Sequence, residues 1–78
     1  MEKILNNKIY KHFKAFAKNI KFERVAKGLT QKEVADALEI KTQSYQAYEA
    51  GVSLPSSENL LKLAMVLEVS IDELFDLR

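Results

Sequence analysis

Apolar residues recur at helical spacing in the first third of the chain. Four of them follow one another at i, i+4, i+7 and i+11, on one face of a helix: Ile9, Phe13, Phe16 and Ile20. Asn6 or Asn7 can cap the start of this helix. Lys27 and Gly28 are typical of its end, because a cation suits the last turn and glycine tolerates a left-handed backbone. The pattern predicts one helix of about 20 residues, whose earliest turns project beyond the core.

Shorter helical patterns follow, each opened by a polar residue that can cap a helix. Thr30 and Ser70 each begin a capping box with the glutamate three residues later, and Ser56 or Ser57 can cap a helix between them. The apolar stripes of these helices are Val34, Ala35 and Leu38; Tyr45 and Tyr48; Leu60, Leu61, Ala64, Met65 and Leu67; and Ile71, Leu74 and Phe75. Gly51 closes the helix that carries the two tyrosines. Together these patterns predict an all-α fold, a compact bundle of five helices joined by short loops.

Composition excludes several classes of protein. The chain has 78 residues, of which 47% are hydrophobic and 29% are charged, as expected for one small globular domain. It has no cysteine, which excludes disulfides and thiolate metal sites. No apolar run approaches the roughly 18 residues that a membrane span needs, so we expect a cytoplasmic protein with no membrane partner.

Catalytic and cofactor motifs are missing as well. The sequence contains no nucleophile elbow, no acid/base pair in a pocket pattern and no Gly-rich phosphate loop. His12 has no plausible metal-ligand neighbours in the pattern, so we expect it on the surface. The interpretation is a protein that is not an enzyme and that needs no metal, cofactor or small-molecule ligand.

Charge is distributed unevenly along the chain. Residues 1–27 hold eight basic residues against two acidic ones, a net charge of +6, whereas residues 28–78 hold four against nine, a net charge of −5. One interpretation is a surface that attracts anions, with another that repels them. The alternative is a lysine-rich helix that is simply solvated.

The middle of the chain has the pattern of a helix-turn-helix, in which the second of two short helices enters a DNA major groove. Generic helical hairpins look similar, so the positions of particular residues matter. Ala35 lies where the two helices must approach closely. Apolar residues that would hold the second helix across the first are Leu38, Ile40, Tyr45 and Tyr48. This packing leaves Thr42, Gln43, Gln46 and Ala47 facing away from the core.

Several motifs resemble the Cro/CI-type (XRE) helix-turn-helix regulators, in the same order and at similar spacing. They are Gly28–Ala35 (GLTQKEVA), Glu49–Gly51 (EAG), Pro55-Ser56, Glu58–Ala64 (ENLLKLA) and Leu67–Phe75 (LEVSIDELF). The resemblance covers roughly residues 16 to 75. It implies a lambda-repressor-like bundle that acts as a repressor or activator, frequently as a homodimer on a palindromic operator. We therefore divide the chain into an N-terminal extension, residues 1–15, expected to be helical, and a Cro/CI-type domain, residues 16–78.

The resemblance also implies the residues that contact DNA. They are Gln31, Lys32, Lys41, Thr42, Gln43, Ser44, Gln46 and Ala47. Gln31 would contact the phosphate backbone, while residues of the helix from about 42 to 50 would read bases in the major groove. A glutamine amide can accept from adenine N6 and donate to N7 at once, and Lys41 can reach guanine or a phosphate. The family pairs an arginine with the glutamate before the glycine, which here gives Arg24 and Glu49 as a structural ion pair.

The chain departs from the family pattern around the turn. Glu39 stands where the family prefers glycine, so a non-glycine residue is expected at positive φ. Lys41 stands where a capping serine or threonine is usual, and a cap at Thr42 would shift the base-facing register by one residue. The loop at residues 52–54 has no basic residue, and the predicted recognition helix has no arginine.

Both ends of the chain allow more than one interpretation. Residues 1–15 and the turn after them allow three interpretations. The helix could contact phosphates through Lys8, Lys11, Lys14 and Lys18, or it could contact a second copy or a partner through Ile4, Leu5, Ile9 and Tyr10. The third possibility is a plain helical extension. Near the C-terminus, Ile71, Leu74, Phe75 and Leu77 either dimerise or close the core.

We therefore hypothesise that the protein is a transcriptional repressor. It would bind double-stranded DNA as a homodimer, at a short inverted repeat. An antitoxin or other module whose main ligand is a protein partner is the first alternative. A degenerate module that no longer binds DNA is the second.

Overall fold

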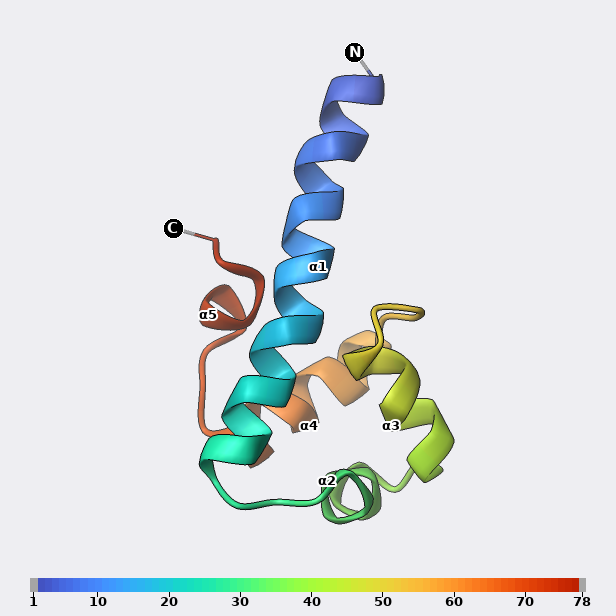
Figure 1. Ribbon diagram of the computed structural model, residues 1–78, viewed down its shortest axis with the longest axis vertical. Helices are drawn as coiled ribbons and strands as arrows, with labels where there is room; N and C mark the ends of the chain where they lie inside the picture. Colours follow the sequence, from blue (N-terminus) through green and yellow to red (C-terminus); the bar gives the residue numbers. More distant parts are fainter. Residues whose placement is uncertain (1, 78) are drawn as a thin grey trace.

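The computed structural model describes the backbone of residues 2–77 and the side chains of residues 7–77. Over this range the chain forms five helices and no strand, as the sequence pattern predicts. The helices are α1 (Glu2–Ala26), α2 (Gln31–Leu38), α3 (Thr42–Glu49), α4 (Ser57–Leu67) and α5 (Ile71–Phe75). In Figure 1, α1 stands upright with its first turns beyond the other helices, which gather around its C-terminal half. No helix in the described range has the length and apolar character needed to cross a membrane.

One hydrophobic core joins all five helices. Its buried members are Phe16, Ile20, Val34, Ala35, Leu38, Tyr45, Tyr48, Leu63, Ala64, Leu67 and Leu74. Phe75 stacks on Phe16 with ring centroids 4.7 Å apart, which holds α5 against α1. Because each fully buried large apolar side chain contributes roughly 1.5–3 kcal/mol, this cluster is the main source of the fold's stability.

The start of α1 differs from the prediction. The helix begins at Glu2, so Asn6 and Asn7 lie within it and neither is its N-cap. The helix continues through them because Glu2, Lys3 and Leu5 are good helix formers, and two asparagines cost little in a long helix. α1 therefore has 25 residues and passes through the expected boundary between residues 15 and 16 without a break.

The apolar stripe of α4 also differs from the prediction. Leu63 is fully buried, whereas Leu61 is 56% exposed and Met65 is 71% exposed. Leu60, Leu63, Ala64 and Leu67 follow the i, i+3, i+4, i+7 spacing that faces the core, and Leu61 and Met65 lie about 100° away from it. The prediction of Leu61 and Met65 as core residues was wrong.

Side chains from α1 complete the C-terminal end of α5. The His12 side chain is half-buried, and its Nδ1 donates to the Phe75 carbonyl at 2.7 Å. Asn19 Nδ2 donates to the Leu74 carbonyl at 3.0 Å and to Asp76 Oδ1 at 3.1 Å. The last carbonyls of a helix lack partners within it, so these two residues satisfy groups that α5 leaves open. His12 is therefore a structural residue, and the prediction of a plain surface histidine was wrong.

The four apolar residues near the C-terminus differ in burial. Leu74 is buried and Phe75 is half-buried, so both close the core. Ile71 is half-buried and Leu77 is 49% exposed, and both line a shallow apolar groove with Ile9 and Phe13 of α1. Ile4 and Leu5 lie outside the residues whose side chains the structure describes.

Candidate nucleic-acid interface

The turn between α2 and α3 consists of three residues, 39–41. Glu39 adopts the left-handed conformation, with φ 58° and ψ 42°, which confirms the positive φ expected at this position. Its amide donates to the Asp36 carbonyl and the Ile40 amide donates to the Ala35 carbonyl, both at 3.0 Å. These bonds satisfy the end of α2 and turn the chain into α3. A non-glycine residue in this conformation costs roughly 1–2 kcal/mol, which the fold tolerates here.

α3 begins at Thr42, and Lys41 is its N-cap residue. The Lys41 carbonyl accepts from the amides of Ser44 and Tyr45, but the Lys41 side chain makes no capping bond. Thr42 is therefore not the cap, so the one-residue shift that a cap at Thr42 would cause does not arise, and the base-facing assignment stays a prediction. The first amides of α3 have no side-chain acceptor, so they remain able to donate to an anion such as a phosphate oxygen.

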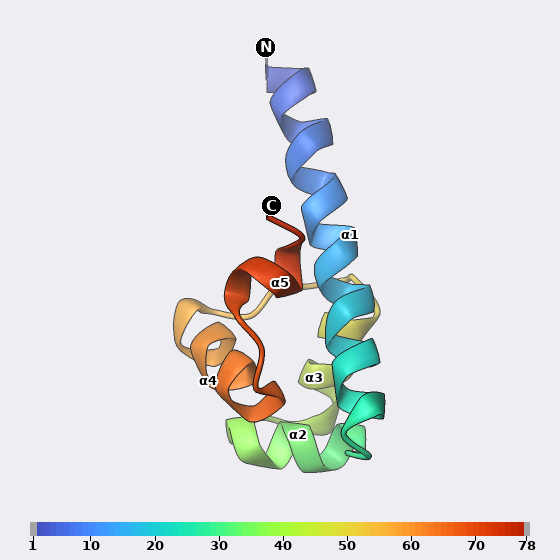
Figure 2. The same cartoon turned by 90° about the vertical axis from the view of Figure 1, so that its left-hand side faces the viewer.

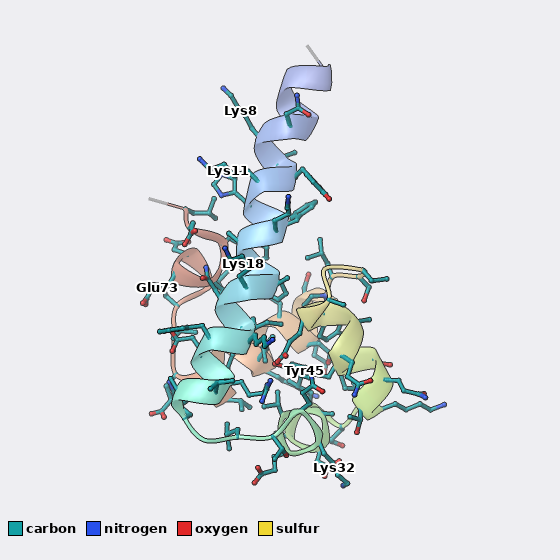
Figure 3. All side chains as sticks on the ribbon, in the orientation of Figure 1. Lys8, Lys11, Lys18, Lys32, Tyr45 and Glu73 are labelled. Atoms are coloured by element: carbon teal, nitrogen blue, oxygen red, sulfur yellow. The ribbon has the colours of Figure 1, made fainter. Side chains whose placement is uncertain are left out.

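The predicted base-reading residues share the outward side of α3. Tyr45 and Tyr48 are buried and fasten the helix to the core, with their rings packed edge to face at 6.1 Å. Lys41, Gln43, Ser44 and Gln46 are exposed, while Thr42 and Ala47 are half-buried. Among the described residues, the side chains of Lys41, Thr42, Gln43 and Ser44 form no hydrogen bond or ion pair. Figure 3 shows α3 with polar side chains directed away from the bundle.

Lys32 lies apart from this face. It is exposed on α2, and its Nζ contacts Asp36 Oδ2 at 2.9 Å in an i, i+4 pair. The hydrogen bond to Asp36 raises the pKa of Lys32. Such an exposed pair contributes little to stability and leaves the lysine able to exchange Asp36 for another anion.

Arg24 and Glu49, which the resemblance implies as a structural pair, lie in contact beneath the outward face of α3. Arg24 Nε donates to Glu49 Oε2 at 2.6 Å and Arg24 Nη2 donates to Oε1 at 3.1 Å, a bidentate arrangement. The side chains are only 12% and 4% exposed. Arg24 also donates from Nη1 to the Leu29 carbonyl at 2.8 Å, so one guanidinium joins α1, the α1–α2 loop and α3.

Two further donors converge on the same carboxylate. Tyr45 donates its hydroxyl to Glu49 Oε2, and Gln31 Nε2 donates to Oε1 at 3.0 Å. Burial disfavours the charged form of Glu49, but the hydrogen bonds from Arg24, Tyr45 and Gln31 outweigh it and hold the pKa below its usual 4.5. Burial and the bond to Glu49 raise the pKa of Tyr45, and the bond to Glu49 raises that of Arg24. The group is therefore a charged pair with a neutral phenol at neutral pH.

The ion pair determines how two glutamine amides are oriented. A carboxylate can only accept, so Gln31 must present its NH₂ group to Glu49. Its oxygen then faces Gln46, whose Nε2 donates to Gln31 Oε1 at 3.2 Å. Gln46 keeps its carbonyl oxygen and one N–H free toward solvent. The charge of Arg24 in α1 thus determines, through Glu49 and Gln31, how the amide of Gln46 is oriented on the surface of α3.

Sequence reasoning did not find this network beyond the pair itself. Tyr45 was assigned to the core only, and Gln31 to a backbone contact only. The i, i+4 spacing of Tyr45 and Glu49 within one helix was an available signal for their contact. The link from Gln31 to Glu49 joins residues far apart in the sequence, and no local pattern indicates it.

Three lysines of α1 lie on another side of the molecule. In Figure 3, Lys8, Lys11 and Lys18 extend from α1 toward the side where α5 lies, and α3 lies on the opposite side. The arrangement does not bring them beside Lys41 or Gln43. Among the described residues, no group of His, Asp or Glu side chains could hold a metal ion.

Comparison with known proteins identifies related chains. The profile of a family described as helix-turn-helix matches residues 20–74. The chain is 50% identical over 52 residues to the cryptic phage CTXphi transcriptional repressor RstR of Vibrio cholerae, a match covering 67% of this chain and 46% of RstR. It is 41% identical over 59 residues to the uncharacterized HTH-type transcriptional regulator YqaE of Bacillus subtilis, covering 76% of this chain and 51% of YqaE.

A third relative is the SPbeta prophage-derived uncharacterized HTH-type transcriptional regulator YonR of Bacillus subtilis. The identity is 41% over 57 residues, which is 73% of this chain and 53% of YonR. The chain spans about half the length of the curated relatives it matches. No solved structure matches it.

Proposed function

Since the chain belongs to the helix-turn-helix family, in its Cro/CI-type (XRE) branch, we propose that it regulates transcription by inserting α3 into the major groove of double-stranded DNA. The observation that carries the proposal is the outward face of α3. Its polar side chains lie on the helix that the buried tyrosine pair fastens to the core. Four of these side chains form no hydrogen bond or ion pair within the described residues: Lys41, Thr42, Gln43 and Ser44. Polar groups left open on a rigid helix are suited to base edges and phosphates.

Each residue of this face has a chemical role in the proposal. Gln43 reads adenine through its amide, and Ala47 packs against a thymine methyl group. Lys41 binds guanine or a phosphate, and Thr42 and Ser44 donate to bases or phosphates beside it. These assignments keep α3 close to the groove floor, because the half-buried Thr42 and Ala47 allow a close approach.

The glutamine pair refines the assignment of Gln31 and Gln46. Gln46, held by Gln31, retains one acceptor and one donor, which is what a bidentate contact with adenine needs. Gln31 uses one N–H on Glu49 and keeps the other for a phosphate oxygen near the start of α2. Lys32, one residue later, supplies a second phosphate contact when it leaves Asp36.

The proposed regulator is a repressor that binds as a homodimer to a short inverted repeat. RstR, a relative at 50% identity, is named as a transcriptional repressor. The apolar groove between α1 and α5, lined by Ile9, Phe13, Ile71, Phe75 and Leu77, is the surface that we assign to the dimer. A two-fold dimer through one surface places two copies of α3 on symmetry-related half-sites.

Selection of bound sequences from a random DNA pool tests the proposal. Wild type should enrich one inverted repeat, and Gln43→Ala should lose the preference at one base pair per half-site, with affinity lowered about tenfold. Asn7→Ala is the matched control, because it removes an exposed helical amide far from α3. Binding should weaken steeply as salt rises, since phosphate contacts release counterions.

Three results would contradict the proposal. Enrichment of no sequence by wild type would refute specific DNA binding. An unchanged motif with Gln43→Ala would refute the register of α3. A tight complex with another protein, in the absence of any DNA affinity, would instead support a partner-binding module.

A further inference from the structure

The proposed DNA-binding face lies on α3. A different exposed surface, on α1, combines positive charge with apolar side chains. Lys14, Lys18, Lys21 and Val25 follow the i, i+4, i+7, i+11 spacing of one helix face, and Phe22 lies one turn after Lys18. We call these five residues the α1 outer face. Phe22 is 69% exposed and Val25 is 59% exposed, and with Lys18 and Lys21 they line a shallow hollow. Lys18 and Lys21 have no ion pair with any described residue.

α4 presents a face of the opposite character. Glu58, Leu61, Met65 and Glu68 follow the i, i+3, i+7, i+10 spacing and are all exposed, and we call them the α4 outer face. Two apolar side chains lie between two acids. Glu58 is 79% exposed and reaches Lys62 only at 3.7 Å, a weak pair that another cation can replace.

The two faces lie on opposite sides of the molecule. In Figure 2, α1 forms one edge of the bundle and α4 forms the other. The α1 outer face points away from the core on which α4 packs, because Phe16 and Ile20 occupy the opposite side of α1. α3 lies on a third side, which is the far side in Figure 2 and the right-hand side in Figure 1.

We propose that the α1 outer face of one copy of this chain binds the α4 outer face of a second copy. Phe22 and Val25 cover Leu61 and Met65, which removes apolar area on both helices from water. Lys18 and Lys21 precede Phe22 along α1, so with the two helices antiparallel they lie beside Glu68, the acid at one end of this apolar centre. The unequal charge of the two parts of the chain, +6 for residues 1–27 and −5 for residues 28–78, favours this orientation over contact between like faces.

The contact is head-to-tail and does not close on itself. Since the two faces are different and lie on opposite sides, each bound copy still has one face open to a further copy. α3 lies on neither of these two sides, so the contact leaves the outward face of α3 uncovered in every copy. The proposed dimer groove between α1 and α5 is a separate surface and remains accessible.

Two variants and their mixture test the contact in the absence of DNA. Phe22→Asp blocks the α1 outer face and Met65→Asp blocks the α4 outer face, and both residues are exposed enough for the fold to persist, which circular dichroism checks. In sedimentation velocity, wild type should grow in mass with concentration without a fixed end point. Each variant alone should associate about tenfold or more weakly than wild type. An equimolar mixture should form larger species than either variant, because each supplies the face that the other lacks.

Val52→Asp is the matched control, since it places the same charge at an exposed apolar residue on neither face, and it should associate like wild type. Lys18→Glu mixed with Glu68→Lys should reproduce the recovery by exchanged charges, and added salt should weaken it. A wild-type mass that stays constant up to about 1 mM overturns the proposal. So does a variant that associates like wild type, or a mixture no larger than its components. DNA binding is measured separately, so its failure is distinguishable from failure of this contact.

Discussion

Replacing Glu49 by glutamine removes one negative charge from the centre of the network with almost no change in volume. Glu49→Gln leaves the Arg24 guanidinium, only 12% exposed, without its counter-charge. It also places an NH₂ group where the carboxylate accepts from Arg24, Tyr45 and Gln31. The substitution should therefore weaken the attachment of α3 to α1 more than any exposed charge substitution does.

The size of the effect follows from burial. Removing one partner of a buried ion pair costs roughly 3–5 kcal/mol. Arg24 keeps some solvent contact and its bond to the Leu29 carbonyl, so we expect the lower end, about 3 kcal/mol. A chain of this length is stable by roughly 4–12 kcal/mol in total. The loss should lower the melting temperature by about 12–24 °C.

Urea unfolding followed by circular dichroism measures the change directly. Asp36→Asn breaks the Lys32 pair, whose side chains are 74% and 62% exposed, and should cost less than about 0.5 kcal/mol. The triple variant Arg24→Met, Tyr45→Phe, Glu49→Leu should recover much of the loss, because a buried pair replaced by apolar residues is often nearly neutral and no buried hydroxyl is left without an acceptor. A Glu49→Gln protein within about 0.5 kcal/mol of wild type would refute the argument from burial.

Three further predictions concern the same fold. Because folding lowers the pKa of Glu49, its carboxylate stabilises the folded state above the usual pKa of 4.5, and this contribution is lost as pH falls through the folded-state pKa. Below about pH 4.5, the urea midpoint should therefore fall more for wild type than for Glu49→Gln. Asn19→Ala should lower the free energy of unfolding by about 1–2 kcal/mol and speed amide exchange in α5, because the bonds to Leu74 and Asp76 are lost. The control Asn7→Ala should change neither quantity, and equal exchange rates in α5 for the two variants would contradict the capping role of Asn19. Glu39→Gly should raise the free energy of unfolding by about 0.5–1 kcal/mol, since glycine adopts φ 58° without strain, and an unchanged urea midpoint would contradict it.

Local chemistry made some parts of this fold predictable. Thr30 and Ser70 each cap a helix as expected, and of the two candidates Ser56 and Ser57 it is Ser56 that caps α4; a capping bond joins residues three apart and is visible in any short window. α1 has no such cap at Asn6 or Asn7, and there the predicted start was wrong. In α4 nearly every residue from Leu60 to Leu67 is apolar, so periodicity could not separate the buried Leu63 from the exposed Leu61. The contacts of His12 and Gln31 depend on helices distant in sequence, which no local pattern contains.

A buried ion pair beside a surface helix requires a reason, because apolar residues of the same size would often be as stable. We infer that its role is to orient donors and acceptors on the outward face of α3. Arg24 fixes Glu49 as an acceptor, Glu49 fixes the amide of Gln31, and Gln31 fixes that of Gln46. Apolar residues at positions 24 and 49, together with Tyr45→Phe, would still fasten α3 but would leave both amides free to rotate. The triple variant should therefore fold, yet lose the preference for adenine at the base pair that we propose Gln46 reads.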